Sequence, residues 1–126
     1  MNYIANAFSL SMLPGEHAVH LRVLSTTADY VRGRLVGAPY ESFVGHAGTA
    51  RLFSAVLGIE VVVNRSSLSL SDPNDRLIVG QYVGPRLPEG ATSLPDGADI
   101  RWFQITWREP GVLANPMNVI EGGFYS

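Results

Sequence analysis

The sequence predicts an α+β protein, with a small mixed β-sheet and about two helices packed on it. Two features of its 126 residues support this class. Runs with β-branched and aromatic residues recur along the chain, separated by turns that contain proline and glycine, which is typical of short strands. Two stretches predict helices, because one opens with threonines that can cap a helix and the other has a single apolar face. The length suits one hydrophobic core, so we expect a domain over 1–109 and a C-terminal extension over 110–126.

The first part of the chain predicts two strands and a helix. Residues 2–8 (NYIANAF) contain β-branched and aromatic side chains, and a Pro-Gly pair follows them. Residues 17–25 (HAVHLRVLS) alternate between two sets of side chains, which predicts a strand with one buried face. Residues 26–36 open with two threonines that can cap a helix, and the GAPY segment at 37–40 ends that helix.

The second helix is predicted over residues 45–57. Ala50, Phe53 and Leu57 fall on one face of it, as expected for a helix that packs on a sheet. Gly58 is a natural C-terminal cap, because glycine adopts the left-handed conformation that ends many helices.

The rest of the chain predicts strands joined by turns. These strands are expected over residues 59–65, 67–71, 76–84 and 100–109. The DPND sequence at 72–75 predicts a turn, and a loop rich in proline and glycine is predicted over 85–99. We expect neither a sequence repeat nor a second globular domain.

Composition and charge argue against several classes of function. The net charge of −2 and the lack of a basic stripe indicate that DNA is not a partner. No apolar run reaches the roughly 18 residues of a membrane span, so no membrane is expected. The absence of cysteine excludes thiol chemistry and fits a cytoplasmic location. All nine cations are arginine, which suits two-point phosphate contacts, although GC-rich coding bias explains this more simply.

The sequence predicts no metal or cofactor site. His17 and His20 are three apart in a predicted strand, where they point to opposite faces, and no third ligand accompanies them. Asp72, Asn74 and Asp75 lack the glycine and the distal glutamate of a calcium loop. Phosphate-binding loops of the P-loop or Rossmann type and a nucleophile elbow are also missing.

His46 is the first candidate for chemistry, because it lies at the start of the second predicted helix. Free N–H groups and the positive end of the helix dipole attract anions there, and Gly45 allows a phosphate to approach the backbone closely. Imidazole is also the side chain best suited to proton transfer near neutral pH. The alternative is a histidine that only caps the helix, and this stretch alone leaves both interpretations open.

A second polar cluster lies in the segment GQYVGPRLPEG at 80–90. Gln81, Arg86 and Glu89 fall at the end of a predicted strand and in the following loop, where active-site groups commonly lie. Arg86 can hold a phosphate through two hydrogen bonds, and Glu89 can orient that arginine or a histidine. The alternative is an ion pair on the surface of a tight loop.

Four segments give the chain a resemblance to a known family. They are YIANAFSLSML, VGHAGTARLFSAVLG, VVVNR and LIVGQYVGPRLPEG. In this order they resemble the viral anti-CRISPR ring nucleases of type III immunity, over residues 3–108. The combination of an NAFS strand end, a GH helix start and an RLPEG loop makes the resemblance specific.

The resemblance implies a substrate and a partner. It implies a small α+β homodimer that binds cyclic tetra-adenylate across its two-fold axis, since the symmetric ring suits a symmetric dimer. The family cleaves the ring without a metal or cofactor. The ribose 2′-hydroxyl attacks the neighbouring phosphate, which yields linear di-adenylate with a 2′,3′-cyclic phosphate end. Loss of this second messenger switches off the type III CRISPR defence.

The resemblance also assigns roles to residues. His46 is implied as the general acid that protonates the departing 5′-oxygen, Arg86 as the group that stabilises phosphate charge, and Glu89 as the group that places the reacting atoms. The implied ligand contacts are Asn6, Ser9, Ser11, Arg65 and Gln81, to which the helix start adds Gly45. Two alternatives remain: a sponge or sensor that binds a cyclic oligonucleotide without cutting it, and a viral structural or regulatory protein that shares only the fold.

Overall fold

The computed structural model describes residues 1–15 and 18–110, which form one five-stranded sheet and two α-helices. The strands are β1 (Asn2–Ala5), β2 (His20–Thr26), β3 (Tyr40–Phe43), β4 (Arg76–Val83) and β5 (Asp99–Arg108). The helical elements are a 3₁₀ turn, η1 (Leu10–Met12), and the helices α1 (Ala28–Val36) and α2 (Ala47–Leu57). The predicted α+β class is therefore confirmed.

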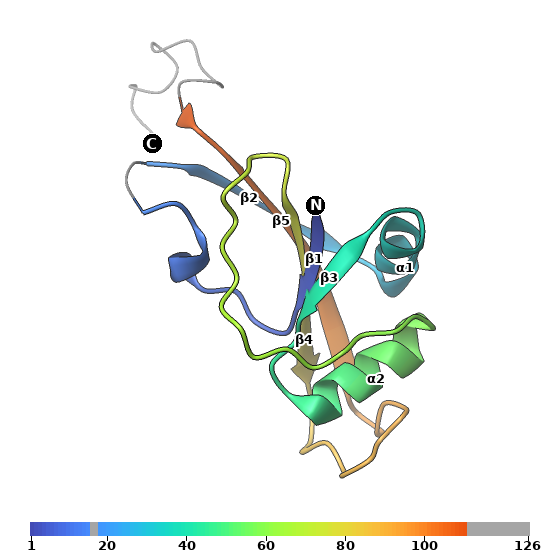
Figure 1. Cartoon of the computed structure of the whole chain (residues 1–126). Coiled ribbons are helices and arrows are strands. Elements are labelled where there is room, and N and C mark those ends of the chain that lie inside the picture. The colour runs from blue at the N-terminus through green and yellow to red at the C-terminus, as the bar shows by residue number, and fades with distance from the viewer. Residues whose placement is uncertain (16–17, 111–126) are drawn as a thin grey trace.

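The sheet has the strand order β2-β5-β4-β1-β3 and mixes both kinds of pairing. β1 is parallel to β3 and β4, whereas β5 is antiparallel to β2 and β4. Parallel strands need a crossover connection, and α2 lies in the crossover from β3 to β4. In Figure 1, α1 and α2 lie to the right of the strands, while much of the coil after α2 passes on the left.

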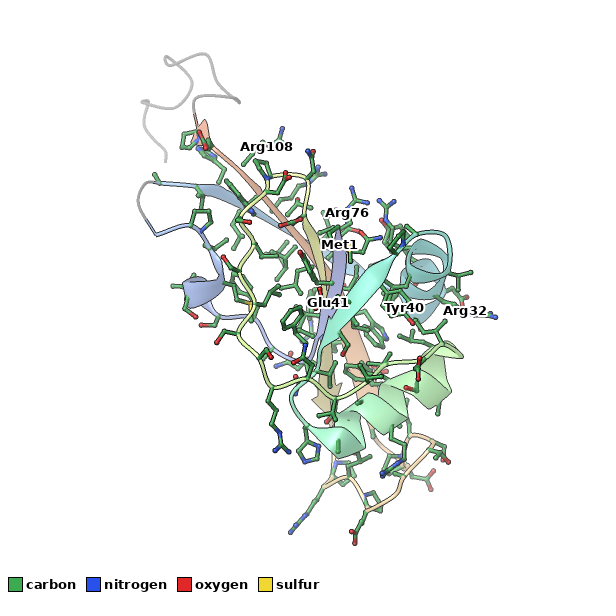
Figure 2. The ribbon with its side chains drawn as sticks, in the orientation of Figure 1. Met1, Arg32, Tyr40, Glu41, Arg76 and Arg108 are labelled. Atoms are coloured by element: carbon green, nitrogen blue, oxygen red, sulfur yellow. The ribbon has the colours of Figure 1, made fainter. Side chains whose placement is uncertain are left out.

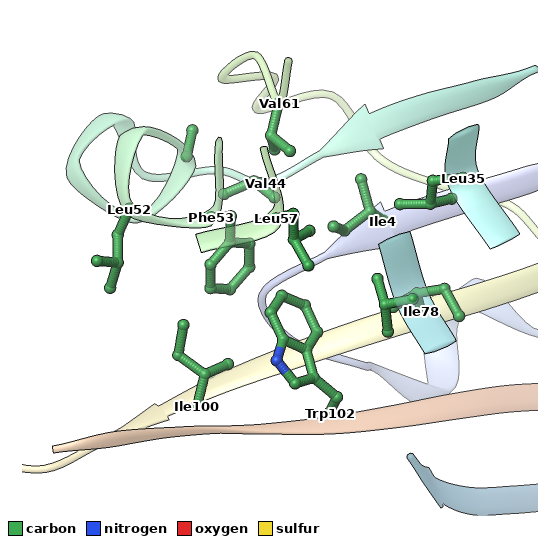
Figure 3. Close-up of a cluster of buried hydrophobic side chains, with 12 residues drawn as sticks. Ile4, Leu35, Val44, Leu52, Phe53, Leu57, Val61, Ile78, Ile100 and Trp102 are labelled. Atoms are coloured by element: carbon green, nitrogen blue, oxygen red, sulfur yellow. The ribbon is translucent and has the colours of Figure 1, made fainter. Parts of the chain in front are cut away.

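The face of the sheet under the helices carries the main core (Figure 3). Phe53 of α2 packs against Trp102 of β5, with ring centroids 4.9 Å apart. Gly80 of β4 makes room for this pair, because a methyl group at that position would lie 2.5 Å from Trp102 and 2.6 Å from Phe53. Buried aliphatic residues complete the cluster, among them Ile4, Val31, Leu35, Leu52, Leu57 and Ile78. This packing fixes α2 on the sheet and so fixes where the helix begins.

Two predicted strands, 59–65 and 67–71, are not strands in the structure. One isolated bridge, Val44 to Val63, joins the first of them to the chain after β3. A side chain also holds this segment beside β3, because the Ser42 hydroxyl donates a hydrogen bond to the Val62 carbonyl at 2.6 Å. In the first segment Val61 is buried in the main core, whereas Val62 and Val63 are exposed. In the second segment Leu68 and Leu70 are buried as irregular chain in a second core cluster, on the sheet face without helices.

β3 is a strand where the sequence predicts only the end of the first helix. It has four residues and pairs from Tyr40 with Asn2 to Phe43 with Ala5. A strand of four residues is too short to show a clear alternation of apolar and polar side chains. The glycine and proline directly before it indicate a turn, so the sequence did not show where the strand begins.

The other predicted elements are confirmed within three residues at each described end. The predicted cap is also confirmed, because Gly58 has the left-handed φ of 68°. The predicted turn at 72–75 forms, with the Asp75 N–H donating to the Asp72 carbonyl at 2.8 Å. His17 and residues 111–126, most of the predicted extension, lie outside the described residues.

β2 lies at an edge of the sheet and is more exposed than the sequence predicts. The alternation predicts one buried face, yet every residue before Thr26 is exposed. Val23 is 52% exposed, and Leu21 and Leu24 are 39% and 40% exposed. The prediction that one face of this strand is buried is therefore wrong for a single chain. Exposed apolar surface of this kind is typical of a protein contact.

Candidate functional site

His46 caps the N-terminus of α2. Its backbone is extended, and its Nδ1 accepts a hydrogen bond from the Thr49 N–H at 3.2 Å. The Ala50 N–H donates to the His46 carbonyl at 2.9 Å and so closes the first turn. The N–H groups of Ala47 and Gly48 have no partner within the helix, as at every helix start. Because the cap occupies Nδ1, Nε2 is the ring nitrogen that a ligand can reach.

The loop before His46 is held from two sides. The Asn6 side-chain oxygen accepts from the Gly45 N–H at 3.2 Å, and the Arg65 Nε donates to the Gly45 carbonyl at 3.0 Å. Both residues, predicted as ligand contacts, thus position the backbone of the site. A Cβ on Gly45 would come no closer than 3.9 Å to the Arg65 side chain, so the protein itself does not require glycine there.

The start of α2 and the loop after β4 enclose a pocket of about 910 Å³. Figure 1 shows this loop, in gold, beside α2. The pocket is lined by His46, Ala47, Gly48, Arg51, Arg86, Leu87, Pro88, Glu89 and Gly90. The three residues predicted to carry the chemistry, His46, Arg86 and Glu89, therefore meet in one pocket, although the second and third are far from the first in the sequence.

The pocket has an excess of positive charge. Two arginines, Arg51 and Arg86, line it with a single carboxylate, Glu89, and the positive end of the α2 dipole adds to them. Within the described residues no ion pair joins Arg86 to Glu89. The surface ion pair considered from the sequence is thus not formed here, and both side chains can turn to a ligand.

Arg51 is a pocket residue that the sequence analysis missed. It follows Ala47 by one helical turn and so lies on the same face of α2. Helical spacing counted from the helix start is the signal that could have identified it. Its guanidinium can hold two phosphate oxygens, as that of Arg86 can.

A second, smaller pocket lies on the sheet face without helices. It has a volume of about 370 Å³, and its lining includes Asn6 and Gln81 together with the apolar side chains of Val23, Phe103 and Ile105. Two predicted ligand contacts are therefore brought together here, with part of the exposed surface of β2.

Ser9 and Ser11 lie in or next to η1 and line neither of these pockets. Their hydroxyl oxygens are 3.0 Å apart, and Ser9 Oγ accepts from the Ser11 N–H at 3.3 Å. Figure 1 shows η1, in blue, to the left of the sheet and away from α2. A single chain therefore does not bring these two predicted contacts to His46.

Residues 1–15 and 18–110 contain no group of three or more His, Asp or Glu side chains placed to hold a metal ion. In the same ranges no helix has both the length and the apolar character to cross a membrane. The arginines labelled in Figure 2, Arg32, Arg76 and Arg108, lie at different edges of the molecule.

The chain is similar to proteins of Sulfolobus viruses. A family model described as STIV B116-like matches residues 2–104. "Uncharacterized protein 26" of Sulfolobus islandicus filamentous virus (isolate Iceland/Hveragerdi) is 31% identical over 91 residues, which are 71% of this chain and 74% of that protein. The structure of B116 of Sulfolobus turreted icosahedral virus has a TM-score of 0.65 at 19% identity and covers 83% of this chain and 97% of that one. The similarity to the B116 structure shows that the two proteins share a fold.

Proposed function

The chain belongs to the STIV B116-like family of viral proteins, and from this premise we propose that it is a ring nuclease that cleaves cyclic tetra-adenylate in the host cytoplasm. The observation that carries the proposal is the single pocket that holds His46, Arg86 and Glu89 at the start of α2. To these three residues the resemblance to ring nucleases assigns the chemistry. On this proposal, the protein removes the second messenger of type III CRISPR defence.

The pocket suits a phosphodiester. Ala47 and Gly48 line it, and their N–H groups lack helical partners, so they can donate to phosphate oxygens. Arg51 and Arg86 add two guanidinium groups, each with the planar geometry that matches a phosphate. We expect the scissile phosphate to lie between the start of α2 and Arg86.

The proposed reaction uses a nucleophile that the substrate itself carries. A ribose 2′-oxygen attacks the adjacent phosphorus and loses its proton to solvent, while the bond from phosphorus to the 5′-oxygen breaks. The imidazolium of His46 gives a proton from Nε2 to that 5′-oxygen. Arg86 stabilises the negative charge that builds up on the phosphate, and Glu89 aligns the 2′-hydroxyl. The product is linear di-adenylate with a 2′,3′-cyclic phosphate end.

The proposal includes a homodimer. Two cleavages on opposite sides of the four-membered ring yield two di-adenylates, and a two-fold axis supplies one His46 pocket for each. The exposed apolar side chains of β2, including Val23, support such an association, because a second copy can remove them from water.

The purified protein is expected to convert cyclic tetra-adenylate to linear di-adenylate in EDTA, because the proposed steps use only side chains and substrate. Chromatography of the products measures the conversion, and light scattering on the same sample reports the dimer. The ring made of 2′-deoxyadenylate is the matched control, since it lacks the nucleophile and should bind without being cut. An intact ribose ring after long incubation with folded protein would contradict the nuclease.

A second function, binding without cleavage, is favoured by one observation. The His46 side chain already has a structural task, because it caps α2 through Nδ1. In a sponge or sensor this task would be its only one, and Arg51 and Arg86 would hold the ring. Tight binding of the ribose ring with no product in the same assay would support this function instead.

Replacing Arg51 by glutamine is expected to weaken binding of the deoxy ring roughly tenfold, because a charge-assisted hydrogen bond to phosphate is lost. Glutamine is nearly as good a helix former as arginine, so α2 should persist. Calorimetric titration measures the affinity. Arg32→Gln, on α1 and outside the pocket, is the matched control for loss of charge. Equal effects of the two substitutions would show that Arg51 acts only through net charge.

A further inference from the structure

We infer that Thr49 and Gly48 are positioning residues for His46, and that the Thr49 hydroxyl supports the imidazole in both protonation states of the proposed reaction. The inference rests on the proposed function and deepens it. Its basis is geometric: the ring of His46 lies over the first turn of α2, in contact with these two residues.

In its neutral state, the imidazole is held in a single tautomer. The Thr49 backbone N–H can only donate, and it points at Nδ1 from 3.2 Å. Nδ1 must therefore offer its lone pair, so the ring hydrogen lies on Nε2. This is the nitrogen that the helix leaves for the pocket.

A general acid, however, must carry a hydrogen on both nitrogens before it gives one away. Once Nδ1 is protonated it can no longer accept from the Thr49 N–H, and the two donors face each other. The Thr49 hydroxyl lies 3.4 Å from the same Nδ1. A hydroxyl can donate or accept, so it can receive the new Nδ1–H. Among the described residues it is the one hydrogen-bonding group beside Nδ1 that fits either state.

Gly48 determines where the ring can lie. A Cβ at this position would be 3.1 Å from Cε1 and 3.3 Å from Nδ1 of His46, closer than ordinary contact. Glycine is otherwise a poor choice inside a helix, since it loses the most backbone freedom. The absent side chain allows the imidazole to lie close to the first turn of α2. Gly48 and Thr49 together thus fix the ring with Nε2 toward a ligand.

The charged groups that share the pocket with His46 are Arg51, Arg86 and Glu89. They act on the imidazole from the next turn of α2 and from the loop after β4. Substitutions at Thr49 and Gly48 leave all three unchanged. A difference among such variants therefore reports the contacts of the ring and not the charge of the pocket.

The first test compares Thr49→Val with Thr49→Ser. Valine keeps the backbone N–H and the shape of threonine but removes the hydroxyl, and serine restores the hydroxyl. We expect the cleavage kcat of Thr49→Val to fall about tenfold, as for one lost hydrogen bond to a charged group, with KM nearly unchanged. Thr49→Ser should keep the wild-type kcat. Equal kcat in all three proteins would overturn the role of the hydroxyl.

Nitrogen-15 NMR of the histidine rings tests the same contacts without any cleavage, with the His46 signals identified by their absence from His46→Asn. In alkaline buffer, wild type and Thr49→Val should both show the hydrogen on Nε2. In acid, a slowly exchanging Nδ1–H should be visible in wild type and Thr49→Ser and lost in Thr49→Val. A mixture of tautomers in wild type would overturn the inference. The expected spectra in a protein that cuts no ring would support the positioning and refute the nuclease.

Gly48→Ala is the second variant, and it separates positioning from stability. Alanine is the better helix former by about 1 kcal/mol, which offsets the loss of the cap when the ring is displaced, so the thermal midpoint should change little. The added methyl should displace the ring, so kcat should drop and the single tautomer should give way to a mixture. A variant with unchanged kcat and unchanged tautomer would show that the ring does not depend on Gly48.

Discussion

Replacing His46 by asparagine is expected to slow cleavage of cyclic tetra-adenylate by about 10²- to 10⁴-fold, the usual contribution of a general acid. Asparagine is the informative substitution, because it caps helices well and so preserves the start of α2 while it removes the proton donor. Binding of the ring should change little, since the helix N–H groups and both pocket arginines remain. Single-turnover rates with the ribose ring and affinities for the deoxy ring measure the two effects separately.

His46→Ala is the companion variant, because it lacks the cap as well as the acid. It should lose the same cleavage rate and about 1 kcal/mol of stability, the usual cost of a missing N-cap. A loss of stability that occurs only in the alanine variant measures the contribution of the cap. A loss of cleavage rate that occurs in both variants measures the contribution of the proton transfer. If the asparagine variant cuts as fast as the wild type, another group supplies the proton and the proposed mechanism is wrong.

The elements that the sequence predicted well are those whose pattern depends on burial against one large partner. In α2 the spacing of Ala50, Phe53 and Leu57 reflects contact with the sheet, and Gly58 marks the end through a backbone requirement. The coil at 59–71 shows the limit of this reasoning. Apolar and β-branched residues indicate a buried pleated surface, and they do not show whether a neighbouring strand is there to pair with.

β2 shows a related limit. Alternation separates the two faces of a strand, but coverage of a face depends on which elements the topology brings to it. Here the order β2-β5-β4-β1-β3 places β2 at the edge, with Val23 exposed. Its apolar residues make sense if another chain covers them, and a single sequence does not contain that information.

For the candidate site, the sequence located His46 at a helix start, because a glycine and a small-residue helix follow a strand-like run. That Arg86 and Glu89 reach the same pocket depends on the crossover of α2 over the sheet, and the local pattern does not contain it. Arg51 could have been identified by counting one helical turn from the helix start. The contact of Thr49 with the imidazole could not, because it depends on the direction of individual side chains within that turn.

The largest effect on stability is expected from Phe53→Ala, which should lower the free energy of unfolding by about 3–5 kcal/mol. Phe53 is fully buried and packs on Trp102 at 4.9 Å between ring centroids. Its loss leaves a cavity beneath α2, next to Gly80, where the backbone offers no side chain to fill the space. Denaturant unfolding measures the change, at one protein concentration, because the stability of the proposed dimer would depend on concentration.

Gly80→Ala tests whether that loss comes from the shared space. In the wild type, the new methyl would lie 2.5 Å from Trp102 and 2.6 Å from Phe53, so the substitution alone should cost about 1–3 kcal/mol through overpacking. With alanine already at position 53, one of the two clashes is gone and Trp102 can move into the cavity. The double variant should therefore be more stable than the sum of the single losses predicts, by roughly 0.5–3 kcal/mol. Strictly additive losses would mean that Phe53 and Gly80 do not compete for one space, and the account of how α2 is held on the sheet would have to change.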